Sequence, residues 1–120
     1  EVIREAEPKI NWDHSGTLNY FNEVQKGMVD AVQKPYGTAY LLSGLPISAA
    51  AKTGTAQIEG NTKINALFVG YLPAAALAEV GAPLDKKIAI LILIENAPEG
   101  IVSTVPIAKD VLGWYYENRL

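Results

Sequence analysis

The chain has 120 residues, of which 49% are apolar, and this suits a single domain with a hydrophobic core. Its formal net charge is -3 and no cluster of Lys or Arg occurs, which argues against nucleic acid and anionic membrane surfaces as partners. Without cysteine, and with His14 as the one histidine, the sequence indicates neither disulfides nor a metal site, and we expect no cofactor. His14 is interpreted as a loop residue.

The chain does not begin with methionine and shows no signal peptide, so we expect it to be part of a longer product. Its longest apolar run, IAILILI at residues 88–94, is far shorter than the about 20 residues that a membrane-spanning helix needs.

The first part of the sequence predicts an extended lead-in and then a helix. Residues 1–16 begin with partial alternation, which predicts a short edge strand, and end in the turn sequence DHSG. From Thr17, the predicted N-cap, apolar residues recur at helical spacing. These residues are Leu18, Phe21, Val24, Met28, and Ala31 or Val32. The sequence KPYG ends this helix, because proline disfavours helical geometry in the preceding residue, and TAYLL adds one turn to a helical region over 17–46.

Three strands are predicted within residues 47–96. The first covers about 47–59, the second 65–73 and the third 87–96. The third strand is apolar on both faces, which predicts a central position in its sheet. The Ala-rich segment between the second and third strands is expected to be a surface excursion with one helical turn.

A C-terminal helix is predicted over residues 103–120. Pro106 suits its first turn. The residues predicted to form its apolar stripe are Ile107, Val111, Leu112 and Tyr115. The rings of Trp114, Tyr115 and Tyr116 are interpreted as packing residues, some of them against the sheet. The order of helix, three strands and helix predicts an α+β fold.

The sequence SAAAKTGTAQ, residues 48–57, is the candidate functional segment. Strand alternation places one set of residues on the same face: Ser48, Ala50, Lys52 and Gly54. Thr53 and Thr55 point mainly the other way. Small side chains around Lys52 leave room for a ligand, and Gly54 lets another backbone come close, so an anionic, extended, peptide-like ligand would suit this edge. The alternative is that Lys52 extends into solvent from an ordinary strand end.

Lys52-Thr53-Gly54 resembles the Lys-Thr-Gly element of the penicillin-recognising serine enzymes. The resemblance extends to an ordered series of four segments: AKTGTAQ, NALFVGYLP, an apolar strand ending in IEN, and PIAKDVLGWYYENR. This series is similar to the C-terminal part of class B penicillin-binding proteins, and most similar to the transpeptidases of cell elongation. Upstream, GMVDAVQKPYGTAY resembles the helix and Gly-Thr-Ala turn that precede the motif in that family. The resemblance implies that residues 1–120 are the C-terminal portion of one transpeptidase domain. Its fold would be an antiparallel sheet flanked by helices, a fragment of the penicillin-recognising serine transpeptidase and β-lactamase-like fold.

By this resemblance, the chain belongs to a D,D-transpeptidase that cross-links peptidoglycan. A serine attacks the D-Ala-D-Ala stem peptide, forms an acyl-enzyme and is blocked by β-lactams. Lys52 would help to bind the terminal carboxylate and polarise the network around the nucleophile. Thr53 and Thr55 would hydrogen-bond the carboxylate of substrate or β-lactam, and Gly54 would permit close approach of the acyl group. The backbone N–H of Thr55 would be one oxyanion-hole donor. Lys52 and Thr55 are therefore the catalytic candidates, and Thr53, Gly54 and Thr55 the substrate-binding candidates.

The family's other two elements are absent. No Ser-x-x-Lys occurs, since Ser48 and Lys52 are four residues apart, and no Ser-x-Asn occurs. Smaller departures are Ala51, where glycine is common, Leu67, where an aromatic is usual, and the long Ala-rich segment. We therefore expect the isolated chain to be inactive and to need the upstream part of the same domain as its partner.

The resemblance also implies a location outside the bacterial cytoplasmic membrane, on its periplasmic face, through an N-terminal anchor that this chain lacks. Two alternatives stay open. One is a β-lactamase or β-lactam sensor of the same superfamily. The other is a non-catalytic module that binds peptides or partners through its exposed sheet.

Overall fold

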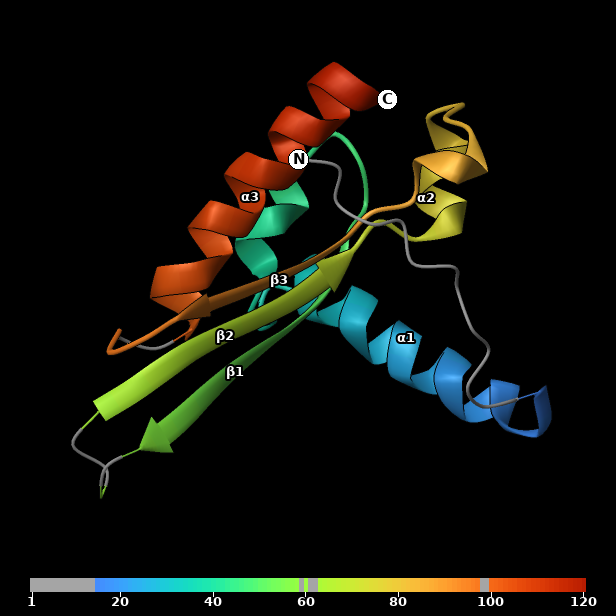
Figure 1. Ribbon diagram of the computed structural model, residues 1–120. Coiled ribbons are helices and arrows are strands. Elements are labelled where there is room, and N and C mark those ends of the chain that lie inside the picture. Colours follow the sequence, from blue (N-terminus) through green and yellow to red (C-terminus); the bar gives the residue numbers. More distant parts are fainter. Residues whose placement is uncertain (1–14, 59, 61–62, 98–99) are drawn as a thin grey trace, which may run out of the picture.

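The computed structural model describes residues 15–58, 60, 63–97 and 100–120, so the expected N-terminal edge strand and His14 lie outside the described residues. Figure 1 shows one antiparallel sheet flanked by helices, which confirms the predicted α+β fold class. In chain order the elements are η1 (Ser15–Thr17), α1 (Leu18–Gln33), η2 (Tyr40–Gly44), β1 (Ala50–Ile58), β2 (Lys63–Tyr71), α2 (Ala74–Glu79), η3 (Leu84–Lys86), β3 (Ala89–Ile94) and α3 (Gly100–Arg119).

The three strands pair in the order β1-β2-β3, and both pairings are antiparallel. Among the described strands β2 is therefore central and β3 lies at an edge, whereas the sequence predicts a central position for the third strand. Both faces of β3 are apolar, but only one of them is packed. Ile90, Ile92 and Ile94 are half-buried, whereas Leu91 and Leu93 are exposed.

One face of the sheet, here called the covered face, packs on α3 and η2 and holds the main core. Thr53, Phe68 and Ile92 form one row across this face, because paired residues of antiparallel strands point the same way. The core cluster joins the sheet to the end of α1, η2 and α3. Its buried members are Val32, Ala39, Leu42, Ala51, Phe68, Val105 and Ala108.

Helix α3 confirms the predicted C-terminal helix but differs from the prediction in its start and its buried side. It begins at Gly100, and Pro106 lies inside it rather than in its first turn. Ile107 and Val111 are exposed. Leu112 of the predicted stripe is buried, and the other residues that α3 buries are Thr104, Val105 and Ala108. Apolar residues surround most of this helix, so spacing alone does not choose the buried side. The small Ala108 allows close approach to the sheet and η2, which favours the side observed.

The Ala-rich segment is more ordered than a surface excursion. It forms α2 and η3, and Ala76 and Leu77 are buried in a second cluster with Leu72 and Leu112. The hydroxyl of Tyr115 on α3 donates a hydrogen bond to the carbonyl of Lys86 over 3.1 Å, which ties η3 to the C-terminal helix.

Helix α1 is confirmed, and Thr17 stands directly before it without a side-chain capping hydrogen bond. Its last turns pack through the buried Val32, while Phe21 and Val24 in its first turns are exposed. Figure 1 shows these first turns pointing away from the rest of the structure. The first half of the predicted apolar stripe therefore lies at the surface of the described structure, with Phe21 44% and Val24 62% exposed.

Candidate active-site strand

The Lys-Thr-Gly motif lies in the first half of β1, at an edge of the sheet. β1 pairs with β2 on one side, and no described strand pairs with its other side. An edge strand presents unpaired backbone N–H and C=O groups along its free side. Lys52, Thr53, Gly54 and Thr55 are thus placed where an extended ligand can pair with the backbone.

The ammonium of Lys52 is exposed and available to an anion. Its Nζ donates a hydrogen bond to the carbonyl of the adjacent Thr53. No carboxylate of the described residues lies within ion-pair distance of this ammonium. A lysine held beside its own strand, with no counter-ion in the described part of the chain, is a suitable partner for a ligand carboxylate.

The register divides the motif between the two faces of the sheet, as strand alternation predicts. Lys52 and Gly54 share a face with Val69 and Leu67 of β2, here called the open face. Thr53 lies on the covered face and is only 8% exposed, whereas Thr55 is exposed. The four residues therefore approach a common edge from both sides of one strand.

Thr38 is a neighbour of the motif that sequence reasoning did not identify as a site residue. The hydroxyls of Thr53 and Thr38 form a hydrogen bond over 2.9 Å, across 15 positions of sequence. Thr38 belongs to the turn between α1 and η2 and is itself exposed. The Gly-Thr-Ala sequence of this turn was the one signal that pointed to it.

Packing within this chain does not require a glycine at position 54. A Cβ placed there would lie 3.5 Å from the Cβ of Leu67, an ordinary van der Waals distance, and the backbone is not in the left-handed region. Glycine at this point therefore leaves free space on the open face beside Lys52, and this space is available to a ligand or another backbone.

The open face is apolar beyond Lys52. Val69 and Leu91 continue the row of Lys52, and Leu67 and Leu93 continue the row of Gly54. Their exposed fractions are large: Val69 41%, Leu91 73% and Leu93 53%. A row of exposed aliphatic side chains on a sheet face is typical of a surface that another segment covers.

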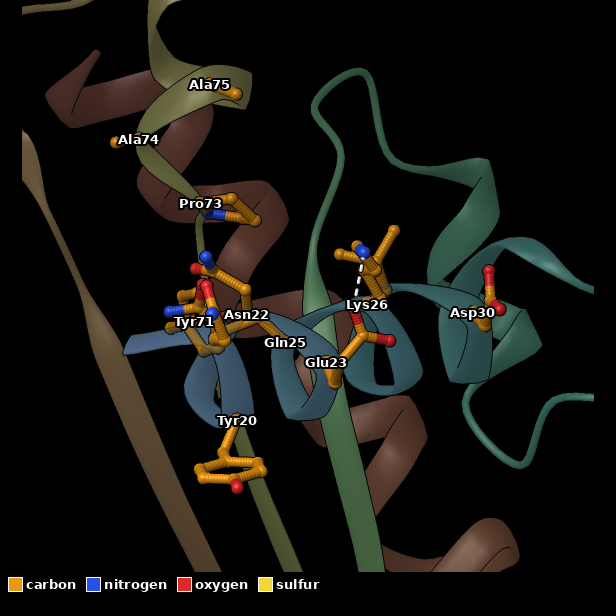
Figure 2. Close-up of a pocket in the computed structure, with 12 residues that line it drawn as sticks. Tyr20, Asn22, Glu23, Gln25, Lys26, Asp30, Tyr71, Pro73, Ala74 and Ala75 are labelled. Carbon is orange, nitrogen blue, oxygen red and sulfur yellow. Dashed lines mark hydrogen bonds and ion pairs between the residues drawn. The ribbon is translucent and has the colours of Figure 1, made fainter. Parts of the chain in front are cut away.

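A separate groove of about 820 Å³ lies between α1 and the segment that joins β2 to α2. Figure 2 shows Asn22, Gln25 and the Glu23–Lys26 ion pair on the α1 side and Tyr71 and Pro73 on the other side. Burial raises the pKa of the Tyr71 phenol above its ordinary value of 10.0. None of residues 52–55 lines this groove, so the groove is not part of the candidate site despite its size.

The described residues contain neither a metal site nor a membrane-spanning helix. No cluster of three or more His, Asp or Glu side chains there could hold a metal ion. None of the helices in that part of the chain combines the length and apolarity needed to cross a bilayer.

Comparison with known proteins places this strand in a family. The family model described as the penicillin binding protein transpeptidase domain matches residues 17–113, which include all of β1 and its motif. A comparison with curated protein sequences gave no match.

Two solved structures are similar to the chain. One is a complex between penicillin-binding protein PBP2 and MreC from Helicobacter pylori, with a TM-score of 0.66 and 29% identity over 88% of this chain and 18% of that chain. The other is Pseudomonas aeruginosa PBP2 in complex with WCK 5153, with a TM-score of 0.64 and 27% identity over 84% of this chain and 20% of that chain. The chain thus spans about a fifth of the length of these proteins. The family model matches most of the chain, and its three strands and flanking helices match part of the fold of these two structures. The chain therefore belongs to the penicillin-binding protein transpeptidase family.

Proposed function

We propose that this chain is the C-terminal portion of a peptidoglycan D,D-transpeptidase and supplies the Lys-Thr-Gly side of its active site. The observation that carries the proposal is the exposed ammonium of Lys52, which has no carboxylate partner among the described residues and lies beside Gly54 on a strand edge that no described strand pairs with, within the residues that match the family. An edge strand with a cation suits a peptide that ends in a carboxylate, as a D-Ala-D-Ala stem does.

The residues of β1 act by binding and by electrostatic stabilisation. Lys52 attracts the terminal carboxylate of the stem peptide and orients the scissile carbonyl, and Thr53 and Thr55 add hydrogen bonds to that carboxylate. When the serine nucleophile attacks, negative charge develops on the carbonyl oxygen, and the backbone N–H of Thr55 donates a hydrogen bond to it. A donor of this kind is worth about 3 kcal/mol of transition-state stabilisation.

The nucleophile must come from outside this chain, because its sequence contains no Ser-x-x-Lys. We assign it to the upstream part of the same domain, of which the chain is the C-terminal portion. The exposed Leu91 and Leu93 and the small share of the similar structures that the chain covers support this assignment. The isolated chain is then inactive, and the complete protein works at the outer side of the bacterial cytoplasmic membrane, held by an N-terminal anchor.

Covalent labelling of the complete protein tests this function. Incubation with a fluorescent penicillin, followed by intact-mass measurement, is expected to show one penicillin added per protein molecule. The isolated 120-residue chain, treated in the same way, is expected to gain none, because it lacks the nucleophile. A complete protein that gains no adduct would contradict the proposal and favour a non-catalytic module that binds peptides along β1. Slow release of the adduct supports a transpeptidase, whereas rapid hydrolysis favours a β-lactamase.

A further inference from the structure

The turn between α1 and η2 is fixed in place by contacts that leave it little freedom. A Cβ at Gly37 would lie 2.2 Å from the carbonyl oxygen of Ala31, so only glycine fits there. The same carbonyl oxygen accepts a hydrogen bond from the N–H of Ala39 over 3.0 Å, and Ala39 is fully buried in the core. Thr38 stands between these two residues, and its backbone position is therefore determined by the end of α1.

Thr38 connects this fixed turn to the motif. Its hydroxyl is 2.9 Å from the hydroxyl of Thr53, which is nearly buried. A threonine hydroxyl has one proton and two acceptor positions, so either member of the pair can be the donor. If Thr38 donates, the proton of Thr53 is free to point to a ligand at the edge of β1, and the two bonds strengthen each other.

We infer that Thr38 is a positioning residue for the transpeptidase site: it holds the side chain of Thr53 and directs the Thr53 proton to the ligand carboxylate. This inference rests on the proposed function. Thr38 acts through Thr53 and takes no part in bond making. Its loss weakens recognition of the carboxylate and leaves the attack of the nucleophile otherwise unchanged. The effect is therefore confined to ligands that carry a free carboxylate.

The test compares acylation of the complete protein by a penicillin and by the methyl ester of the same penicillin, whose carboxylate is blocked. Thr38→Val, which keeps the shape but removes the hydroxyl, is expected to slow labelling by the free acid about three- to tenfold, the effect of one neutral hydrogen bond. Labelling by the methyl ester is expected to stay at the parent rate. Thr38→Ser is expected to restore the rate for the free acid. Ser43→Ala, which removes an exposed hydroxyl from η2, serves as the matched control and is expected to change neither rate.

Three results would overturn the inference while the proposed function stands: a Thr38→Val protein that is labelled by the free acid at the parent rate, one that loses both rates equally, or a Thr38→Ser protein as slow as Thr38→Val. Urea unfolding of Thr38→Val separates an equal loss of both rates from misfolding, because the loss overturns the inference when the variant keeps the parent stability. If Thr38→Val is unfolded, Thr38→Ser decides, and a rate for the free acid below the parent rate would overturn the inference. A parent protein that neither compound labels would overturn the proposed function itself, and the role of Thr38 with it.

Discussion

Replacing Lys52 by alanine in the complete protein is expected to slow acylation by penicillin about 100-fold, since a hydrogen bond to a charged group contributes about 1.5–3 kcal/mol. The ammonium of Lys52 is exposed and contacts no described carboxylate, so its charge is not used in folding. The free energy of unfolding is therefore expected to change by no more than about 0.5 kcal/mol. The labelling rate and urea unfolding of the same preparation measure the two quantities.

Lys87→Ala is the matched control for Lys52→Ala. Lys87 is also exposed, but it precedes β3 and lies outside the motif. Its replacement removes the same charge and is expected to leave the labelling rate at the parent value. Equal slowing of the two variants relative to the parent would show that net charge alone, and not the position of Lys52, governs acylation.

Gly37→Ala is expected to destabilise the complete protein by about 3 kcal/mol, at the upper end of the usual cost of overpacking. The added Cβ would meet backbone atoms of Ala31 at 2.2 and 2.6 Å. Backbone atoms at the end of a helix cannot rotate away as a flexible side chain can. The turn would have to shift, and the hydrogen bond from the N–H of Ala39 to the carbonyl of Ala31 would be lost with it. Urea unfolding measures the loss.

Gly27→Ala, in the helix that precedes this turn, is expected to change the stability in the opposite direction. Gly27 lies in the middle of α1, and a Cβ there would meet nothing within 4 Å. Alanine is the better helix former by about 0.5–1 kcal/mol, so this variant is expected to be slightly more stable than the parent. If both glycine variants had the same stability, the tight turn at Gly37 would not exist in the protein.

The first helix and the first two strands of the fold could be predicted from local pattern because each has a clear period. The alternation in β1 and β2, and the helical spacing from Leu18 to Val32, place these elements within a few residues of their observed bounds. The position of β3 in the strand order could not be predicted, because an apolar strand has the same sequence pattern whether its second face is packed or exposed. The buried side of α3 was likewise ambiguous, and contact with the sheet and η2 decided it in favour of Ala108 over Ile107 and Val111.

The candidate site shows the same division between local and long-range information. The motif from Lys52 to Thr55 can be found in the sequence because its residues are consecutive, and alternation correctly separates the face of Lys52 from that of Thr53. The contact between Thr53 and Thr38 spans 15 positions and depends on how the turn after α1 folds back onto β1. No pattern in the sequence measures that distance. The roles proposed for Lys52, Thr53, Gly54 and Thr55 stay predictions.

The most direct test of the central claim is a crystal structure of the complete protein acylated by a penicillin. Two places compete for the ligand: the edge of β1, and the larger groove between α1 and the start of α2. We expect the carboxylate of the bound penicillin within hydrogen-bonding distance, about 3 Å, of the Lys52 ammonium or the hydroxyls of Thr53 and Thr55. A penicillin bound covalently elsewhere, with Lys52 facing empty solvent, would contradict the assignment of β1 to the active site.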